Sequence, residues 1–183
     1  MTKARVVSYL SVPALALSLL LPAAAAAAQD IFLKIDGIPG ESVDARQKDA
    51  IDVLSFSWGV TAGKNKAVYQ DFSFTKRVDQ ASPQLFLRAA SGQAIPVVAL
   101  TVREAGERQD DFLKYCLTDV QVTGVSTSGS AGGDRPTEQV SLCYSTFFES
   151  YRKQSADGSL GTAFNAGWEL SRNVLLGAAP PTC

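Results

Sequence analysis

Two serines in a glycine-containing segment are the first candidates for a catalytic nucleophile. The segment Gly124-Val-Ser-Thr-Ser-Gly129 places Ser126 and Ser128 near glycines, which loosely resembles the G-x-S-x-G turn of serine hydrolases. The second glycine is displaced by one position, and no helical pattern follows. The chain also contains no histidine, which removes the usual base for activating a serine. We interpret the segment as a Gly/Ser loop, with a hydrolase that pairs one serine with a lysine as an alternative.

Four acidic residues gather near the middle of the chain and are the strongest candidates for cation ligands. They are Glu104, Glu107, Asp110 and Asp111. Their spacing does not match a calcium-binding loop, and they fall in a turn between two expected strands. We interpret them as a solvated turn. The sequence therefore predicts no catalytic residues, no cofactor-binding residues and no metal site.

Composition narrows the classes of partner. The 183 residues carry a formal net charge of -1, with 46% hydrophobic residues and no block of like charges. Nucleic acid and anionic membranes are attracted to clustered positive charge, so we do not expect either as a partner. A chain of this length and composition can bury one sizeable core, and we expect one domain.

The first 28 residues predict a secretory signal peptide. Lys3 and Arg5 precede an apolar run, and the alanines that follow offer an A-x-A cleavage pattern ending at Ala28. A retained membrane anchor is the alternative, although the apolar run is near the short end of the roughly 17–25 residues that span a bilayer. Cleavage at Ala28 would leave a mature chain of formal charge -3, with 15 basic and 18 acidic residues. We expect a mildly acidic protein that is secreted or periplasmic.

One short helix is expected within residues 79–92. Ser82 is a suitable N-cap, Pro83 fits the first turn, and Gly92 can adopt the left-handed conformation that ends a helix. The apolar face of this helix should contain Leu85, Phe86, Ala89 and Ala90. A helix with one apolar face is typical of a helix that packs against a sheet.

The rest of the chain alternates as strands do. The expected strands are residues 31–35, 51–60, 68–77, 95–103, 112–125, 139–151 and 163–172. The strand at 51–60 should place Leu54, Phe56 and Trp58 on one face and form a hairpin with 68–77. Residues 41–49 and the Gly/Ser-rich stretch 126–136 should be loops. About seven strands and one helix predict a β-barrel or β-sandwich with the helix on its flank.

Several of these segments together resemble the haemolysin-coregulated protein (Hcp) family of type VI secretion systems. The resemblance covers residues 31–173. It rests on the segments Phe32-Leu-Lys-Ile-Asp-Gly-Ile-Pro-Gly-Glu41, Ile51-Asp-Val-Leu-Ser-Phe-Ser-Trp-Gly59, Gln70-Asp-Phe-Ser-Phe-Thr-Lys76, Ser82-Pro-Gln-Leu-Phe86, Ala90-Ser-Gly92, Pro136-Thr-Glu-Gln-Val-Ser-Leu142 and Gly167-Trp-Glu-Leu-Ser-Arg-Asn173.

The resemblance implies a mainly β fold, an antiparallel two-sheet β-barrel of about seven strands with one short helix on its flank. Together with the predicted leader, it divides the chain into a signal peptide (1–28), an Hcp-like barrel (29–173) and a flexible C-terminal tail (174–183). It further implies a structural protein and not an enzyme, which assembles as a homohexameric ring, stacks into a tube, and meets secretion-tip components and cargo. The closed ring would cover the exposed edges of each subunit.

Two features depart from what the resemblance implies. Tube proteins of this family are loaded from the cytoplasm, whereas this chain begins with a predicted leader. The connection Thr61–Lys66 is also shorter than the loop of many relatives. These departures favour an alternative function, an exported Hcp-like binding module that acts without a contractile machine.

The three cysteines, Cys116, Cys143 and Cys183, are too widely spaced for a C-x-x-C motif or a zinc site. If 112–125 and 139–151 form a hairpin, Cys143 should lie opposite a residue near Gln121. Cys116 would then be about 16 Å away along the strand, at roughly 3.3 Å per residue. A disulfide requires a Cα separation below about 7 Å. We therefore expect no bond between Cys116 and Cys143, and Cys183 is the remaining partner for either.

Overall fold

The computed structural model describes residues 29–64, 66–104, 110–155 and 159–180. The predicted signal peptide lies outside these residues. The described chain has eleven strands and one helix: β1 (Gln29–Ile35), β2 (Ile51–Ser57), β3 (Val60–Thr61), β4 (Val68–Tyr69), β5 (Phe72–Arg77), α1 (Ser82–Ser91), β6 (Ile95–Glu104), β7 (Asp111–Ser128), β8 (Thr137–Cys143), β9 (Thr146–Gln154), β10 (Leu160–Glu169) and β11 (Val174–Leu175).

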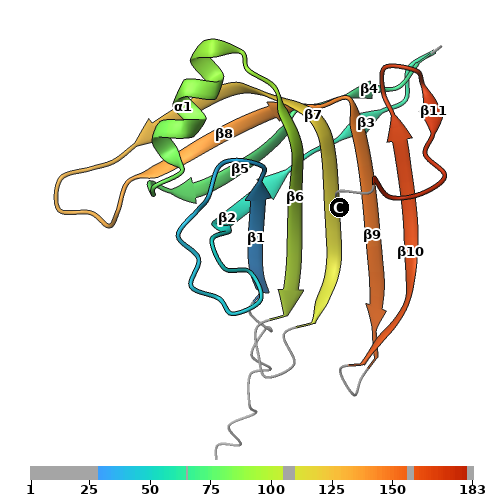
Figure 1. Cartoon of the computed structure of the whole chain (residues 1–183), viewed down its shortest axis with the longest axis horizontal. Helices are drawn as coiled ribbons and strands as arrows, with labels where there is room; N and C mark the ends of the chain where they lie inside the picture. Colours follow the sequence, from blue (N-terminus) through green and yellow to red (C-terminus); the bar gives the residue numbers. More distant parts are fainter. Residues whose placement is uncertain (1–28, 65, 105–109, 156–158, 181–183) are drawn as a thin grey trace, which may run out of the picture.

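Six antiparallel strands close into a barrel. The strand order of the main sheet is β11-β10-β9-β7-β6-β1-β2-β5-β8, and β8 also pairs with β7. The long strand β7 makes closure possible because its first half pairs with β6 and β9, and its second half pairs with β8. The strands β9, β10 and β11 extend the sheet beyond the barrel, and α1 lies on its flank (Figure 1). The predicted fold class is confirmed.

The structure has more strands than the predicted seven because three expected strands are divided. The expected strand 139–151 ends as β8 at Cys143 and resumes as β9 at Thr146. Between them, the Ser145 N–H donates to the carbonyl of Thr118 at 3.0 Å. The expected strand 51–60 is likewise divided into β2 and β3, and the expected strand 68–77 into β4 and β5. A two-residue strand, β11, also lies in the tail, where no pattern predicted one.

A β-bulge changes which side chains of one predicted strand point into the core. The register between β2 and β5 shifts between Val53 and Ser55, so the alternation of β2 is interrupted at that point. Leu54, expected in the core, is 49% exposed. Beyond the bulge, Phe56 stacks on Phe72 with ring centroids 5.9 Å apart, as the predicted alternation requires. The assignment of Leu54 to the apolar face was therefore wrong.

The core fills the barrel between its two walls. It is made of aliphatic and aromatic side chains that alternate along the strands. Its fully buried members include Leu33, Ile51, Phe72, Leu85, Ile95, Val98, Val120, Val140 and Leu142. On the side of the barrel wall nearest β9, Tyr115 and Phe147 join this core with ring centroids 5.3 Å apart.

The helix α1 has the predicted end but not the predicted start. Gly92 has a φ of 66° and donates its N–H to the carbonyl of Arg88, as expected for a helix C-cap. The N-cap is Ala81, and Ser82 is the first helical residue. The Ser82 hydroxyl instead donates to Glu138 at 2.6 Å, so it connects the helix to β8. Ser82 as N-cap was therefore a wrong prediction with a structural cause.

The buried face of α1 is also narrower than predicted. Leu85 is fully buried, but Phe86 is 62% exposed. Adjacent residues on a helix differ by about 100° in direction, so one contact line cannot bury both side chains deeply. The placement of Phe86 in the buried face was wrong.

Candidate assembly surface

One half of the barrel has two strand edges without partners. Strand β2 pairs with β5 along residues 53–57 but with β1 at Ile51 and Asp52 alone. Strand β7 pairs with β8 along Gln121–Ser128, whereas its pairing with β6 ends at Val120. Within the described part of the chain, no strand pairs with the outer side of residues 53–57 or 121–128. We call these two segments the free edges, and they flank the four-stranded half β2-β5-β8-β7.

The outer face of this four-stranded half carries two rows of neutral polar residues, and the exposed Arg77 of β5 lies on the same face in the next row, opposite Thr137. Its inner face carries the buried Phe72, Phe74 and Val140. The outer face has two rows of cross-strand neighbours, Ser57-Ser73-Ser141-Gly124 and Ser55-Thr75-Gln139-Ser126. The hydroxyls of Ser73 and Ser141 lie 3.1 Å apart and form a hydrogen bond. We call these two rows the hydroxyl face, which carries no ionisable side chain in either row.

A buried ion cluster joins the hydroxyl-face strands to the helix. Lys76 of β5 is fully buried, and its ammonium lies 2.6 Å from Asp79 Oδ1 and 3.1 Å from Glu138 Oε2. It also donates to the Ser82 hydroxyl at 2.9 Å. A buried charge is tolerated when it is paired and hydrogen-bonded. The cluster fixes the positions of β5, β8 and the first turn of α1 relative to one another.

A second buried cation holds the loop between β1 and β2. Arg103 of β6 is fully buried, stacks 4.5 Å from the centroid of the Phe32 ring, and donates to Asp44 of the loop. This hydrogen bond holds the pKa of the Asp44 carboxyl below its usual range, and the backbone N–H groups of Arg46 and Gln47 act in the same direction. The loop therefore covers part of the barrel wall as an ordered structure.

The core face continues past the barrel onto the extension of the sheet. Ile31, Val102, Leu113, Tyr151 and Phe164 form one in-register row across β1, β6, β7, β9 and β10. The last two are 43% and 67% exposed. We call Tyr151 and Phe164 the outer apolar pair. Exposed apolar area next to a core is a common feature of protein–protein contact sites.

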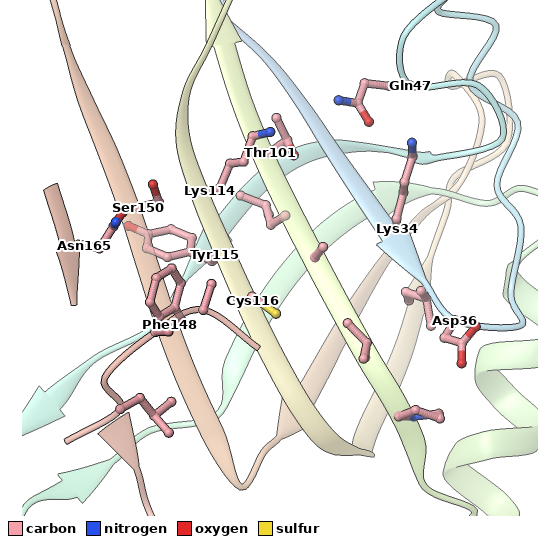
Figure 2. Close-up of a pocket in the computed structure, with 18 of the residues that line it drawn as sticks. Lys34, Asp36, Gln47, Thr101, Lys114, Tyr115, Cys116, Phe148, Ser150 and Asn165 are labelled. Atoms are coloured by element: carbon pink, nitrogen blue, oxygen red, sulfur yellow. The ribbon is translucent and has the colours of Figure 1, made fainter. Parts of the chain in front are cut away.

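The opposite face of the same extended sheet is hollowed. A hollow of about 1260 Å³ lies over β1, β6, β7, β9 and β10, and the residues Leu176–Ala179 form one side of it. Figure 2 shows that its floor combines the polar side chains of Thr101, Lys114 and Ser150 with the Cys116 sulfur and the Phe148 ring. The floor belongs to strands, so its shape is set by the sheet.

The candidate catalytic and cation-binding residues that the structure describes do not converge. Ser126 of β7 belongs to the hydroxyl face. The Ser128 hydroxyl lies 3.4 Å from the Thr137 hydroxyl. Asp110 lies 3.9 Å from Arg46, and Asp111 lies 3.0 Å from Lys114. Glu107 lies outside the described residues. Among the residues that the structure describes, no group of three or more potential metal ligands occurs.

Comparisons with known proteins identify the family of this chain. A family model described as the type VI secretion system effector Hcp matches residues 32–151, more than half of the chain. The chain belongs to the Hcp family. Protein hcp1 of Pseudomonas aeruginosa is 40% identical over 159 residues, which cover 80% of this chain and 98% of that Hcp protein.

Solved structures place the chain in the Hcp family as well. Hcp1 from Salmonella typhimurium superposes with a TM-score of 0.72 at 39% identity, covering 81% of this chain and 99% of that protein. A structure described as a type six secretion system protein gives a TM-score of 0.77 at 33% identity, covering 81% and 100%. The chain is a tube protein of the type VI secretion Hcp family, which confirms the resemblance found in the sequence.

The sequence did not predict the free edges. The free edges depend on which strands pair, and no local pattern reports pairing between distant segments. Part of the outer apolar pair could have been predicted. The strand period of two places Tyr151 on the same face of β9 as the buried Phe147, with Glu149 between them. Within the residues that the structure describes, no helix is long and apolar enough to cross a membrane.

Proposed function

We propose that the mature chain assembles into a closed ring of about six copies, through its two free edges. The observation that carries this proposal is that residues 53–57 and 121–128 are unpaired edges on opposite sides of one four-stranded half. Neighbouring strands in β2-β5-β8-β7 alternate in direction. The β7 edge of one copy would therefore meet the β2 edge of the next copy as an antiparallel partner.

Such a contact joins two different surfaces, and contacts of this kind produce a ring when the rotation between copies closes. Each ring would then have a continuous inner wall, with four strands from every copy. Pairing also satisfies the backbone groups that an exposed edge leaves to solvent. The outer apolar pair would add apolar contact area between copies or between rings.

We further propose that the ring is a non-enzymatic structural unit that stacks into a tube and carries cargo in its lumen. Family membership supports this role, as does the separation of Ser126 and Ser128 from the acidic candidates that the structure describes. Secretion-tip components and effector cargo would be its partners. Because the connection between β3 and β4 is short, we expect stacking between rings to be weaker than stacking in relatives with a longer loop.

The assembly proposal is tested by light scattering and negative-stain imaging of the mature protein. Leu54 lies on the free edge of β2 and is 49% exposed, so a lysine there can be accommodated in the monomer. A lysine on a strand edge opposes edge-to-edge pairing. We expect Leu54→Lys to convert rings to monomers at concentrations where the unmodified protein is a ring.

The matched control is Val43→Lys, which changes a 96% exposed apolar residue in a loop. It should leave the ring intact. If the unmodified protein stays monomeric at high concentration, the ring proposal is overturned and the exported binding module is favoured.

We also propose that residues 1–28 direct export and are removed after Ala28. The basic start, the apolar run and the small residues before Gln29 support this assignment. Intact-mass measurement of the protein recovered from outside the cytoplasm should give a chain beginning at Gln29. Recovery of a chain that begins at Met1 in the membrane fraction would instead indicate a retained anchor.

A further inference from the structure

The hollow over β1, β6, β7, β9 and β10 collects basic side chains on a protein whose formal charge is negative. The whole chain has a formal charge of -1. The lining of the hollow, in contrast, contains more basic than acidic residues. The basic residues are Lys34, Lys48, Lys114 and Arg152, and the acidic residues are Asp36 and Asp49. The hollow is therefore a local region of positive charge.

Most of these basic residues have no ion-pair partner among the residues that the structure describes. Lys34, Lys48 and Arg152 are exposed and unpaired, whereas the Lys114 ammonium lies 3.0 Å from Asp111 Oδ2. Three arginines elsewhere on the surface do have carboxylate partners, in the pairs Arg77–Asp134, Arg135–Glu41 and Arg172–Glu169. The cations of the hollow are thus available to carboxylates from outside the chain.

The floor between these cations carries no carboxylate. It contains two neighbouring cross-strand rows, Lys34-Ala99-Cys116-Phe148-Gly167 and Thr101-Lys114-Ser150-Asn165. Apart from the two lysines, the rows present hydroxyl, amide, sulfur and apolar groups. Such a floor can contact small or apolar side chains and can form hydrogen bonds, and it does not repel a negatively charged partner.

The two floor lysines are separated by a distance that an extended peptide matches. Lys34 lies in register with Cys116 through Ala99, and Lys114 is two residues from Cys116 along β7. Figure 2 shows the two lysines on separate strands of the floor. With strands about 4.8 Å apart and a rise of about 3.3 Å per residue, their Cα atoms are about 12 Å apart.

An extended chain covers about 13 Å in four residues and places side chains i and i+4 on the same face. Two carboxylates four residues apart can therefore reach Lys34 and Lys114 together. A small anion would contact one of these lysines at a time.

We propose that the hollow binds an extended acidic segment of another polypeptide, with carboxylates four residues apart on Lys34 and Lys114. Further acidic side chains of the segment would meet Lys48 and Arg152, and the small side chains between them would lie on the floor near Ala99. The hollow is thus a docking site for a partner whose charge complements its own.

This docking site is separate from the proposed ring contacts and from the hydroxyl face. The hollow includes Tyr115 and Cys116 in the first half of β7, whereas the free edge of β7 comprises residues 121–128. It also lies on the face of the sheet opposite the outer apolar pair. A monomer should therefore bind the acidic segment as a ring does.

The binding should depend on salt. Ion pairs between exposed groups are individually weak and are screened by dissolved ions, so affinity requires several of them at once. We expect the dissociation constant to rise at least fivefold between about 50 and about 500 mM salt. A dissociation constant that salt leaves unchanged would contradict binding through these cations.

Fluorescence anisotropy with labelled peptides tests the ligand class. The probe is an extended peptide rich in valine and serine, with two glutamates four residues apart. It should bind the mature protein at least tenfold more tightly than the same peptide with glutamines. A peptide with the two glutamates adjacent should bind more weakly than the probe. Equal affinities for the probe and the glutamine peptide, or tighter binding of a single-stranded oligonucleotide, would overturn the proposal.

Substitutions locate the site. Lys34→Glu combined with Arg152→Glu should weaken binding of the probe at least tenfold. Lys153→Glu is the matched control, because Lys153 is an exposed neighbour of Arg152 that does not line the hollow. Circular dichroism should show that both variants remain folded. If the two variants lose affinity equally, the probe binds elsewhere and the assignment of the hollow is wrong.

The Leu54→Lys variant separates this proposal from the ring proposal. Leu54 lies on the free edge of β2, outside the hollow. The variant should bind the probe with the affinity of the unmodified protein, whatever its oligomeric state. Loss of binding in Leu54→Lys would show that the site requires assembled copies, which the proposal excludes.

Discussion

Lys76 and Glu138 lie directly opposite each other across β5 and β8, with the Lys76 ammonium 3.1 Å from Glu138 Oε2 and both side chains almost fully buried. Asp79 lies closer still, at 2.6 Å. One buried cation is thus shared by two carboxylates and the Ser82 hydroxyl. The cluster joins the strands of the hydroxyl face to the helix.

Replacing Lys76 by methionine should destabilise the fold strongly. The change keeps most of the length of the side chain but leaves Asp79 and Glu138 without their buried cation. Breaking a buried ion pair from one side costs about 3–5 kcal/mol. Urea unfolding should show this loss. Arg77→Met is the control, because the Arg77–Asp134 pair is exposed and should contribute little. Similar midpoints for both variants would contradict the role of the cluster.

The Asp44–Arg103 hydrogen bond should make stability depend on acidic pH. The pKa of Asp44 is lowered in the folded protein, first by the Arg103 hydrogen bond. Its contribution is therefore present above the unfolded pKa of about 3.9 and is lost as pH falls through the folded pKa. Thermal unfolding between pH 2 and 6 should show a shallower acid slope for Asp44→Asn. The exposed Asp52→Asn is the control and should retain the original slope.

Tyr144 should make stability depend on alkaline pH. Burial raises the pKa of its phenol to about 12, and the hydroxyl donates to the carbonyl of Gln70 at 3.1 Å. Its contribution is complete below the unfolded pKa of about 10 and is lost as pH rises toward the folded value. We expect Tyr144→Phe to flatten the decline in unfolding temperature between pH 10 and 12. An unchanged decline would assign it to other groups.

Gly40 should not tolerate a side chain. A Cβ atom there would overlap the backbone carbonyl of Ala50, which cannot move as a flexible side chain can. The Gly40 N–H also donates to the carbonyl of Asp49 at 2.8 Å, so the chain is held at this point. Gly40→Ala should cost about 1–3 kcal/mol of stability. Gly177→Ala, where no atom lies within 4 Å, should cost less, and equal losses would argue against a steric cause.

Much of the fold followed from local patterns. Cys143 was predicted to lie opposite a residue near Gln121, and it pairs with Gln121, because the Gly/Ser-rich turn sets the register of the β7–β8 hairpin. The predicted absence of a Cys116–Cys143 bond is confirmed for the same reason. Hydrophobic alternation and turn residues reflect the geometry of residues that are close in sequence. The two strands of a hairpin are close in sequence, so such patterns predict hairpins well.

The errors arose where a distant contact overrides the local pattern. The bulge that exposes Leu54 is set by pairing with β5, and the break after Cys143 is set by the shared strand β7. The Ser82 hydroxyl contacts Glu138, which lies 56 residues along the chain. The free edges were invisible for the same reason, since an unpaired edge is defined by strands that end elsewhere.

The hydroxyl face has a consequence for transport. In a ring joined at the free edges, these two rows would line the passage, and their short neutral side chains offer a lining without fixed charge. A moving polypeptide would meet weak, evenly spaced hydrogen-bonding groups, each readily exchanged for water. The two rows themselves neither repel nor attract cargo according to its charge, so contacts made with them should vary little with ionic strength.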